Sequence, residues 1–227
     1  MSLARAATVD LERMREISLT ALLMLQGLLI FVVEPLVALD VRLTGLVTGL
    51  LGIGFVVAAM VASRSKAAMS MMLGCALVAL IGAATRRSHP SPVTDCLGHG
   101  ASLLALGTLS AVVGRAVFGP GQITAHRVRG AIVLYLNVAL MFTAAYRLIA
   151  ELAPDAFTLP KADNDATAAG TMLYFSFTTL TSTGYGDVLP VHPFARSLAN
   201  LEAIVGQLFP ATLLARIVTL HLEARRH

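Results

Sequence analysis

Charge is scarce in this chain of 227 residues, because only 13% of them are Asp, Glu, Lys or Arg. A soluble domain of this size usually carries about twice that share. Tryptophan is absent, and no stripe of basic residues interleaved with aromatic residues occurs, which argues against a nucleic-acid-binding surface. The two cysteines, Cys75 and Cys96, are too few for a disulfide framework, so we expect two free thiols.

Long apolar runs take the place of charge, and 56% of the residues are hydrophobic. A helix needs about 20 mostly apolar residues to cross a bilayer. Six runs meet this length, and they predict an all-α membrane protein with six transmembrane helices at about residues 17–37, 43–62, 67–84, 101–118, 130–152 and 194–222.

The distribution of Lys and Arg predicts the orientation of these helices. With the N-terminus inside the cell, eleven basic residues lie on the cytoplasmic side and six on the outside. Cytoplasmic loops carry an excess of Lys and Arg, so we expect a cell-membrane protein with both termini in the cytoplasm. Arg86 and Arg87, which this orientation places outside, count against it.

A shorter apolar segment, at about residues 171–181, lies between the fifth and the last predicted span. A helix of roughly eleven residues reaches only about 17 Å, so this segment should enter the membrane and return. The polar stretch TSTGYGD, residues 181–187, follows it. Gly184 and Gly186 can adopt positive φ without penalty. Alternating right-handed and left-handed residues would turn successive carbonyl oxygens to the same side, and four copies around an axis would stack them into rings.

The residues Ser182-Thr183-Gly184-Tyr185-Gly186, followed by Asp187 and Pro190, resemble the selectivity filter of the potassium channels, commonly TVGYG. The resemblance implies a homotetramer that conducts K⁺ passively and needs no other cofactor. It further implies that K⁺ is bound by the backbone carbonyls of Ser182, Thr183, Gly184 and Tyr185 and by the Ser182 hydroxyl. The stronger resemblance covers about residues 129–222, and the whole chain looks like a six-span bacterial potassium channel without a working voltage sensor.

The resemblance also implies roles for residues around the filter. Tyr174 and Phe175 occupy the place of the aromatic cuff on which Tyr185 packs, and Asp187 would tie the filter to the pore helix. Phe175 stands where many family members place a Trp, and Thr178 stands where some carry a Glu.

Glu202 is an acid inside a predicted span and therefore a functional candidate. We expect it to brace the pore helix from behind the filter, through Thr178 or Thr179. The alternative is a protonated and inert side chain.

The last span should line the inner pore. Gly206 and Pro210 weaken or interrupt its hydrogen bonds, which suits either a gating hinge or a static kink that aids packing. Leu213, Leu214 or Val218 could form an apolar constriction nearer the inner end.

Residues 1–118 are predicted to form a four-helix transmembrane bundle, which resembles a voltage sensor but is poor in charge. Its fourth span carries a single arginine, Arg115, whereas steep voltage gating needs about three to four charges per subunit. Residues 119–129 form a cytoplasmic linker, and residues 130–227 form the pore domain. Arg127 and Arg129 of the linker either bind anionic lipid headgroups or only follow the positive-inside rule.

Three other functions agree less well with the sequence than a potassium channel does. A less selective cation channel would be favoured by a change at Tyr185, which is intact, and a transporter subunit would carry several pore modules where one is found. A membrane enzyme is disfavoured because Ser182 has no neighbouring base in the sequence. A predicted external loop holds His89, Asp95 and the Cys96-x-x-His99 spacing, which without a second paired motif does not predict a metal site.

Overall fold

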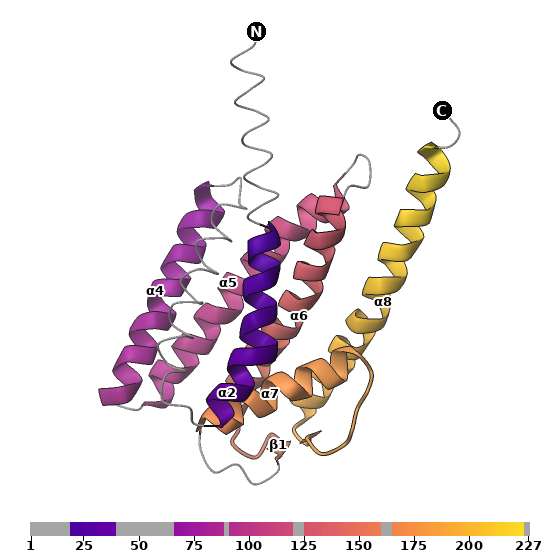
Figure 1. Ribbon diagram of the computed structural model, residues 1–227. Coiled ribbons are helices and arrows are strands. Elements are labelled where there is room, and N and C mark those ends of the chain that lie inside the picture. The colour runs from indigo at the N-terminus through magenta and orange to yellow at the C-terminus, as the bar shows by residue number, and fades with distance from the viewer. Residues whose placement is uncertain (1–18, 40–65, 89–90, 120–124, 160–164, 225–227) are drawn as a thin grey trace.

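The structure is a computed structural model that describes residues 19–39, 66–88, 91–119, 125–159 and 165–224 (Figure 1). Residues 19–28 are α-helical, and the helix continues through a π-helical turn, η1 (Leu29–Val33), into α2 (Glu34–Ala38). The helices that follow are α4 (Lys66–Ser88), α5 (Pro92–Phe118), α6 (Ala125–Leu152), α7 (Asp165–Leu180) and α8 (Pro193–Ala224). Two short strands, β1 (Phe157–Thr158) and β2 (Leu189–Pro190), pair in antiparallel fashion.

Four described helical segments are long and apolar enough to cross a membrane: Leu19–Val37, Pro92–Arg115, Arg127–Leu152 and Pro193–Arg216. They correspond to the first, fourth, fifth and last predicted spans. The third predicted span is helical as part of α4, in which Lys66–Val78 forms a shorter apolar stretch. The second predicted span, residues 43–62, lies outside the described residues. The chain is therefore a mostly helical, multi-pass membrane protein.

Helix α5 begins at Pro92, well before the start that was expected at residue 101. Ser91 is extended, Pro92 occupies the first helical turn where its missing N–H costs nothing, and the Thr94 hydroxyl donates to the Ser91 carbonyl over 2.7 Å.

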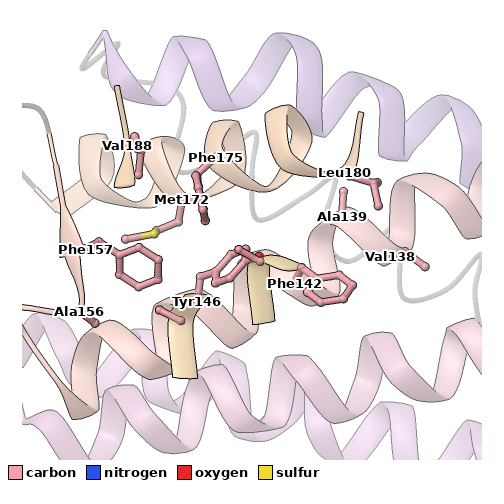
Figure 2. Close-up of a cluster of buried hydrophobic side chains, with 12 residues drawn as sticks. Val138, Ala139, Phe142, Tyr146, Ala156, Phe157, Met172, Phe175, Leu180 and Val188 are labelled. Carbon is pink, nitrogen blue, oxygen red and sulfur yellow. The ribbon is translucent and has the colours of Figure 1, made fainter. Parts of the chain in front are cut away.

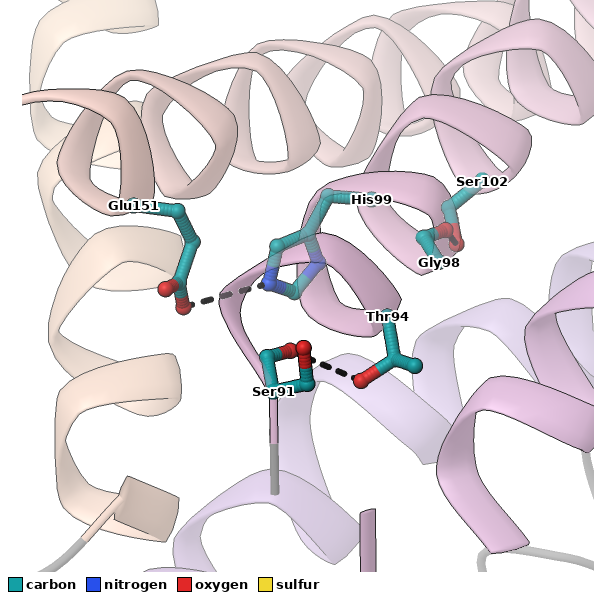
Figure 3. A network of polar contacts seen from close by, with 6 residues as sticks. All are labelled: Ser91, Thr94, Gly98, His99, Ser102 and Glu151. Atoms are coloured by element: carbon teal, nitrogen blue, oxygen red, sulfur yellow. Dashed lines mark hydrogen bonds and ion pairs between the residues drawn. The ribbon is translucent and has the colours of Figure 1, made fainter. Parts of the chain in front are cut away.

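The early start means that the prediction of an external loop holding Asp95, Cys96 and His99 is wrong, because all three lie on α5. His89 lies outside the described residues. On α5 the buried His99 faces α6, and its Nε2 lies 3.8 Å from Oε1 of Glu151 (Figure 3). Within the described part of the chain, no group of three or more His, Cys, Asp and Glu residues could hold a metal ion.

The N-terminal helices pack directly on α6 and α7. Helix α5 lies between α4 and α6 (Figure 1), and α2 contacts α7. The ring centroids of Phe31 in η1 and Phe177 of α7 are 5.8 Å apart. One apolar core joins the first helix, α4, α5 and α6 through Leu19, Leu22, Met72, Leu109, Val113, Val117, Ala131, Val133 and Leu134.

Helix α7 is shorter than its neighbours and crosses them near one end of the molecule, where a loop connects it to β2 and α8 (Figure 1). Its first turns extend the predicted 171–181 segment backwards to Asp165. Side chains from α6, β1, α7 and α8 fill the space behind it (Figure 2). We call this group, centred on Tyr146, Phe157, Phe175 and Glu202, the rear cluster.

Candidate functional site

Residues 181–187, which we call the glycine loop, alternate in backbone handedness. Ser182, Gly184 and Gly186 have φ angles of 55°, 54° and 80°, and no other described residue has a positive φ. The two glycines behave as the sequence predicted. Ser182 was not expected in this conformation, because residues with a side chain seldom adopt it.

The carbonyl end of α7 holds the start of the glycine loop through backbone hydrogen bonds. The N–H groups of Thr183 and Gly184 donate to the Thr178 carbonyl over 2.8 and 3.1 Å, and Ser182 N–H donates to the Thr179 carbonyl over 2.9 Å. Thr178 and Thr179 thus support the loop through their carbonyls. The last turn of α7 and the loop form one continuous hydrogen-bonded unit.

Tyr174 supports the outer half of the loop. Its ring stacks on Tyr185, with ring centroids 6.1 Å apart and planes within 5°. Its phenol also interacts with the carboxylate of Asp187, which accepts the Val188 N–H over 3.1 Å. Phe175 has turned to the opposite side of α7, where it packs 5.0 Å from the ring of Tyr146 (Figure 2). Within one chain, therefore, Tyr174 alone supplies the expected aromatic support.

Glu202 is completely buried in the rear cluster, whereas the residues of the glycine loop are exposed in one chain. Its Oε2 lies 2.5 Å from the Tyr146 hydroxyl of α6, and its Oε1 lies 2.5 Å from the Ser176 hydroxyl of α7. The predicted partners, Thr178 and Thr179, were wrong: the Thr178 hydroxyl donates instead to the Phe175 carbonyl. Glu202 therefore links three helices, through partners that were not singled out in the sequence.

Gly206 lies where α8 crosses the end of α7. A Cβ atom at this position would lie 1.8 Å from the carbonyl oxygen of Leu180, so only glycine permits the crossing. Helix α8 continues through Pro210 to Ala224. Close packing thus explains why position 206 is a glycine. A hinge at Gly206 and Pro210 stays a prediction.

The three residues predicted as a constriction differ in their surroundings. Leu213 is half-buried against the apolar core of the N-terminal helices, whereas Leu214 is exposed. The side chain of Val218 lies outside the described residues.

Gln207, the next residue of α8, reaches the start of the glycine loop. Its Nε2 donates to the hydroxyl of Ser182 over 2.8 Å. Gln207 is not among the predicted site residues, although a polar residue beside Gly206 within an apolar span is a signal that could have identified it.

The far end of the loop is attached to the segment after α6. Phe157 pairs with Pro190 and Thr158 with Leu189, and the N–H groups of Val191 and His192 both donate to the Ala156 carbonyl. Arg196 of α8 adds a hydrogen bond from Nε to the Pro190 carbonyl over 3.0 Å. The loop is thus anchored at both ends.

Arginines join the helix ends on the side away from the glycine loop. Arg216 of α8 donates to the carbonyls of Phe118 and Gly119, at the end of α5, over 2.7 and 2.6 Å. Arg127 donates to the same Gly119 carbonyl over 2.8 Å, and Arg129 donates to the Thr20 hydroxyl over 3.1 Å. The two arginines that were considered as lipid ligands therefore already have partners within the chain.

Comparison with known proteins agrees with this geometry. Residues 131–222, which include most of α6, all of α7 and the glycine loop, and nearly all of α8, match the model of a protein family described as an ion channel. This part of the chain is similar to an ion channel pore domain, and the matched family is one of channels. No curated protein and no solved structure matches the chain.

Proposed function

We propose that the protein is a potassium channel, in which the glycine loop is the selectivity filter. The observation that carries the proposal is the alternation of positive φ at Ser182, Gly184 and Gly186. A strand that alternates in handedness can direct successive carbonyl oxygens toward one axis. Rings of such oxygens replace the water shell of a dehydrated K⁺ ion. The ion sites would be formed by the carbonyls of Ser182, Thr183, Gly184 and Tyr185, with the Ser182 hydroxyl.

The direction of α7 supports the same function. Helix α7 ends at Leu180, directly before the loop. The carboxyl end of a helix carries a partial negative charge, which favours a cation at that end. Helix α7 would thus act as the pore helix.

The exposed surfaces of the pore domain favour a homotetramer. Every residue from 181 to 187 is exposed in one chain, and Tyr185 is 71% exposed. Helix α8 also leaves large apolar side chains uncovered, namely Phe194, Leu201, Ile204, Leu208 and Leu214. One chain supplies one quarter of a fourfold ring of oxygens, and identical copies usually close such rings by rotational symmetry.

We further propose weak or absent voltage dependence, with both termini in the cytoplasm. Arg115 is the one basic residue of α5, and it is exposed near the end of that helix. Steep gating requires about three to four charges per subunit that cross the field. A current that follows the driving force between strongly negative and strongly positive potentials is expected, and a steep sigmoid would contradict this part of the proposal.

Ion flux from proteoliposomes tests the main proposal. Potassium flux should exceed sodium flux by at least about tenfold in the parent protein, because the filter replaces the hydration shell of K⁺. Equal fluxes would favour a less selective cation channel. Gly184→Ala should abolish selective flux, since its backbone has φ of 54°. Gly74→Ala in α4, where no atom lies within 4 Å of the new Cβ, is the matched control. Unchanged potassium flux in Gly184→Ala would exclude the filter assignment.

A further inference from the structure

The oxygen contacts behind α7 determine where a proton must lie. Three contacts are close enough to require hydrogen bonds: Tyr146 Oη to Glu202 Oε2 at 2.5 Å, Ser176 Oγ to Glu202 Oε1 at 2.5 Å, and Ser176 Oγ to the Ala139 carbonyl oxygen at 2.8 Å. Two oxygen atoms at such distances repel unless a proton lies between them. Three contacts therefore require three protons.

The hydroxyl groups supply only two of these protons. Tyr146 and Ser176 carry one each, and the carbonyl of Ala139 carries none. The Ser176 proton must point to Ala139, because no other proton is available to that contact. The contact between Ser176 and Glu202 then needs a proton from the carboxyl group itself.

We propose that Glu202 is a neutral carboxylic acid that donates to Ser176 and thereby positions the pore helix. The chain of donors runs from Tyr146 to Glu202, from Glu202 to Ser176, and from Ser176 to the backbone of α6. It joins α6, α7 and α8 at a point three residues before Thr179, whose carbonyl holds the start of the glycine loop. Glu202 acts on the filter through α7, so the inference rests on the proposed channel function.

Burial gives the same protonation state independently. Glu202, Tyr146 and Ser176 each have no exposed surface. An ionised carboxylate in such a place is costly unless a cation compensates it. Among the described residues, no Lys, Arg or His pairs with Glu202. The titratable groups that act on it electrostatically are Tyr146 and, more weakly, Tyr135, both from α6, and α7 presents only the hydroxyl of Ser176.

Infrared spectroscopy on the purified protein tests the protonation state without any measurement of transport. The parent at neutral pH should show a carbonyl band of a buried, protonated carboxyl group that disappears in Glu202→Gln. A band that is absent in the parent, or that persists unchanged in Glu202→Gln, would overturn the proposal. This result does not depend on whether the protein conducts potassium, so it separates the present inference from the proposed function.

Flux measurements test the positioning role. Glutamine keeps one donor for Ser176 and one acceptor for Tyr146, so Glu202→Gln should retain potassium flux within about twofold. Glu202→Leu removes the acceptor of the buried Tyr146 hydroxyl and the donor to the Ser176 oxygen, while Ser176 can still donate to the Ala139 carbonyl, and it should lower flux, or the yield of assembled protein, by about tenfold or more. Full flux in Glu202→Leu would contradict the positioning role.

The pH profile distinguishes positioning from a purely steric role. Deprotonation of Glu202 removes the proton shared with Ser176, so potassium flux in the parent should fall as the external and internal solutions become strongly alkaline. Glu202→Gln has no proton to lose and should give a flatter profile, and Tyr135→Phe serves as a control for titration of the second tyrosine. Identical alkaline profiles in the parent and Glu202→Gln would overturn the proposal.

Discussion

The two sides of α7 differ in how much of their environment one chain supplies. On the rear side, Tyr146, Ser176 and Glu202 are completely buried, and their hydrogen bonds are formed within the chain. On the front side, all residues from 181 to 187 are exposed, and the loop keeps its shape through backbone bonds to α7 and through contacts with Tyr174 and Gln207. The rear side thus finds its hydrogen-bond partners within one chain, whereas the front side is exposed in one chain and is expected to contact other copies of the protein.

The rear side therefore constrains the identity of side chains, whereas the front side constrains the conformation of the backbone. The rear side requires particular side chains at fixed distances, because unpaired polar groups cost most where water is absent. The front side requires particular backbone conformations, which glycine supplies without a packing partner: no atom lies within 4 Å of a Cβ built on Gly184 or Gly186. Substitutions on the rear side should therefore act on stability, and those on the front side should act on ion binding.

The largest effect is expected at Gly206, where the two sides meet. Gly206→Ala would place a methyl group 1.8 Å from the Leu180 carbonyl oxygen, and backbone cannot yield as a side chain does. We expect a loss of about 3 kcal/mol or more in the free energy of unfolding, at the upper end for overpacking. Thermal unfolding of the purified protein measures it. Gly74→Ala is the control, and it should be neutral or stabilising by about 1 kcal/mol. Equal melting temperatures for the two variants would show that α8 does not cross α7 so closely.

Removal of one rear hydroxyl should have the next largest effect. Tyr146→Phe keeps the ring among Phe157 and Phe175 but leaves Glu202 Oε2 without its donor. The expected destabilisation is about 1–3 kcal/mol, the usual cost of a buried unpaired group. Tyr135→Phe is a matched control on the same helix, because the Tyr135 hydroxyl makes only a long contact of 3.5 Å with the Leu180 carbonyl. If Tyr135→Phe lowered the free energy of unfolding as much as Tyr146→Phe, the special role of the Tyr146 hydroxyl would be contradicted.

On the front side, Gln207 and Ser182 should be energetically coupled. Gln207→Leu, Ser182→Ala and the double variant form a cycle that isolates their 2.8 Å hydrogen bond. We expect a coupling of about 1 kcal/mol in the binding of K⁺, measured by calorimetry, and little change in the melting temperature. Effects that add to within about 0.5 kcal/mol would indicate that the two side chains act independently.

The smallest effect is expected at the outer edge of the front side. Tyr174→Phe keeps the stacking on Tyr185 and removes only the phenol that interacts with Asp187. Because these groups are exposed, we expect only a small loss of affinity for K⁺. Tyr174→Leu also removes the stacked ring and should lower the affinity further. A larger effect for phenylalanine than for leucine would contradict this assignment of the two contributions.

The sequence predicted the front side better than the rear. Gly184 and Gly186 identify a loop with positive φ, because the conformational freedom of glycine is a local property. The partners of Glu202 depend on how three helices are rotated about their axes, and the sequence does not determine this. An acid inside an apolar span indicated that a partner existed, but Thr178, Thr179 and Ser176 offer the same hydroxyl. Only the packing of α7 against α6 selects Ser176.

Helix boundaries were limited in the same way. The start of α5 was placed at residue 101, because Asp95, Cys96 and His99 are polar enough to resemble a loop. In the structure His99 is buried against α6 near Glu151. This contact, between residues distant in the sequence, favours a helix at a position where the local composition favours a loop. At Gly206 the sequence leaves both a gating hinge and a static kink that aids packing open, because nothing in the sequence shows that the backbone of Leu180 lies beside it.

The bonds from Arg216 to the last carbonyls of α5 connect the mobility of two segments that are distant in the chain. Any outward movement of the C-terminal half of α8 must first break the hydrogen bonds from the Arg216 guanidinium to the carbonyls of Phe118 and Gly119. The Gly119 carbonyl would keep its hydrogen bond from Arg127, whereas the Phe118 carbonyl, in the last turn of α5, would need solvent or lipid as its new donor. The free energy of displacing α8 therefore includes a contribution from α5, although α5 contributes no residue to the glycine loop.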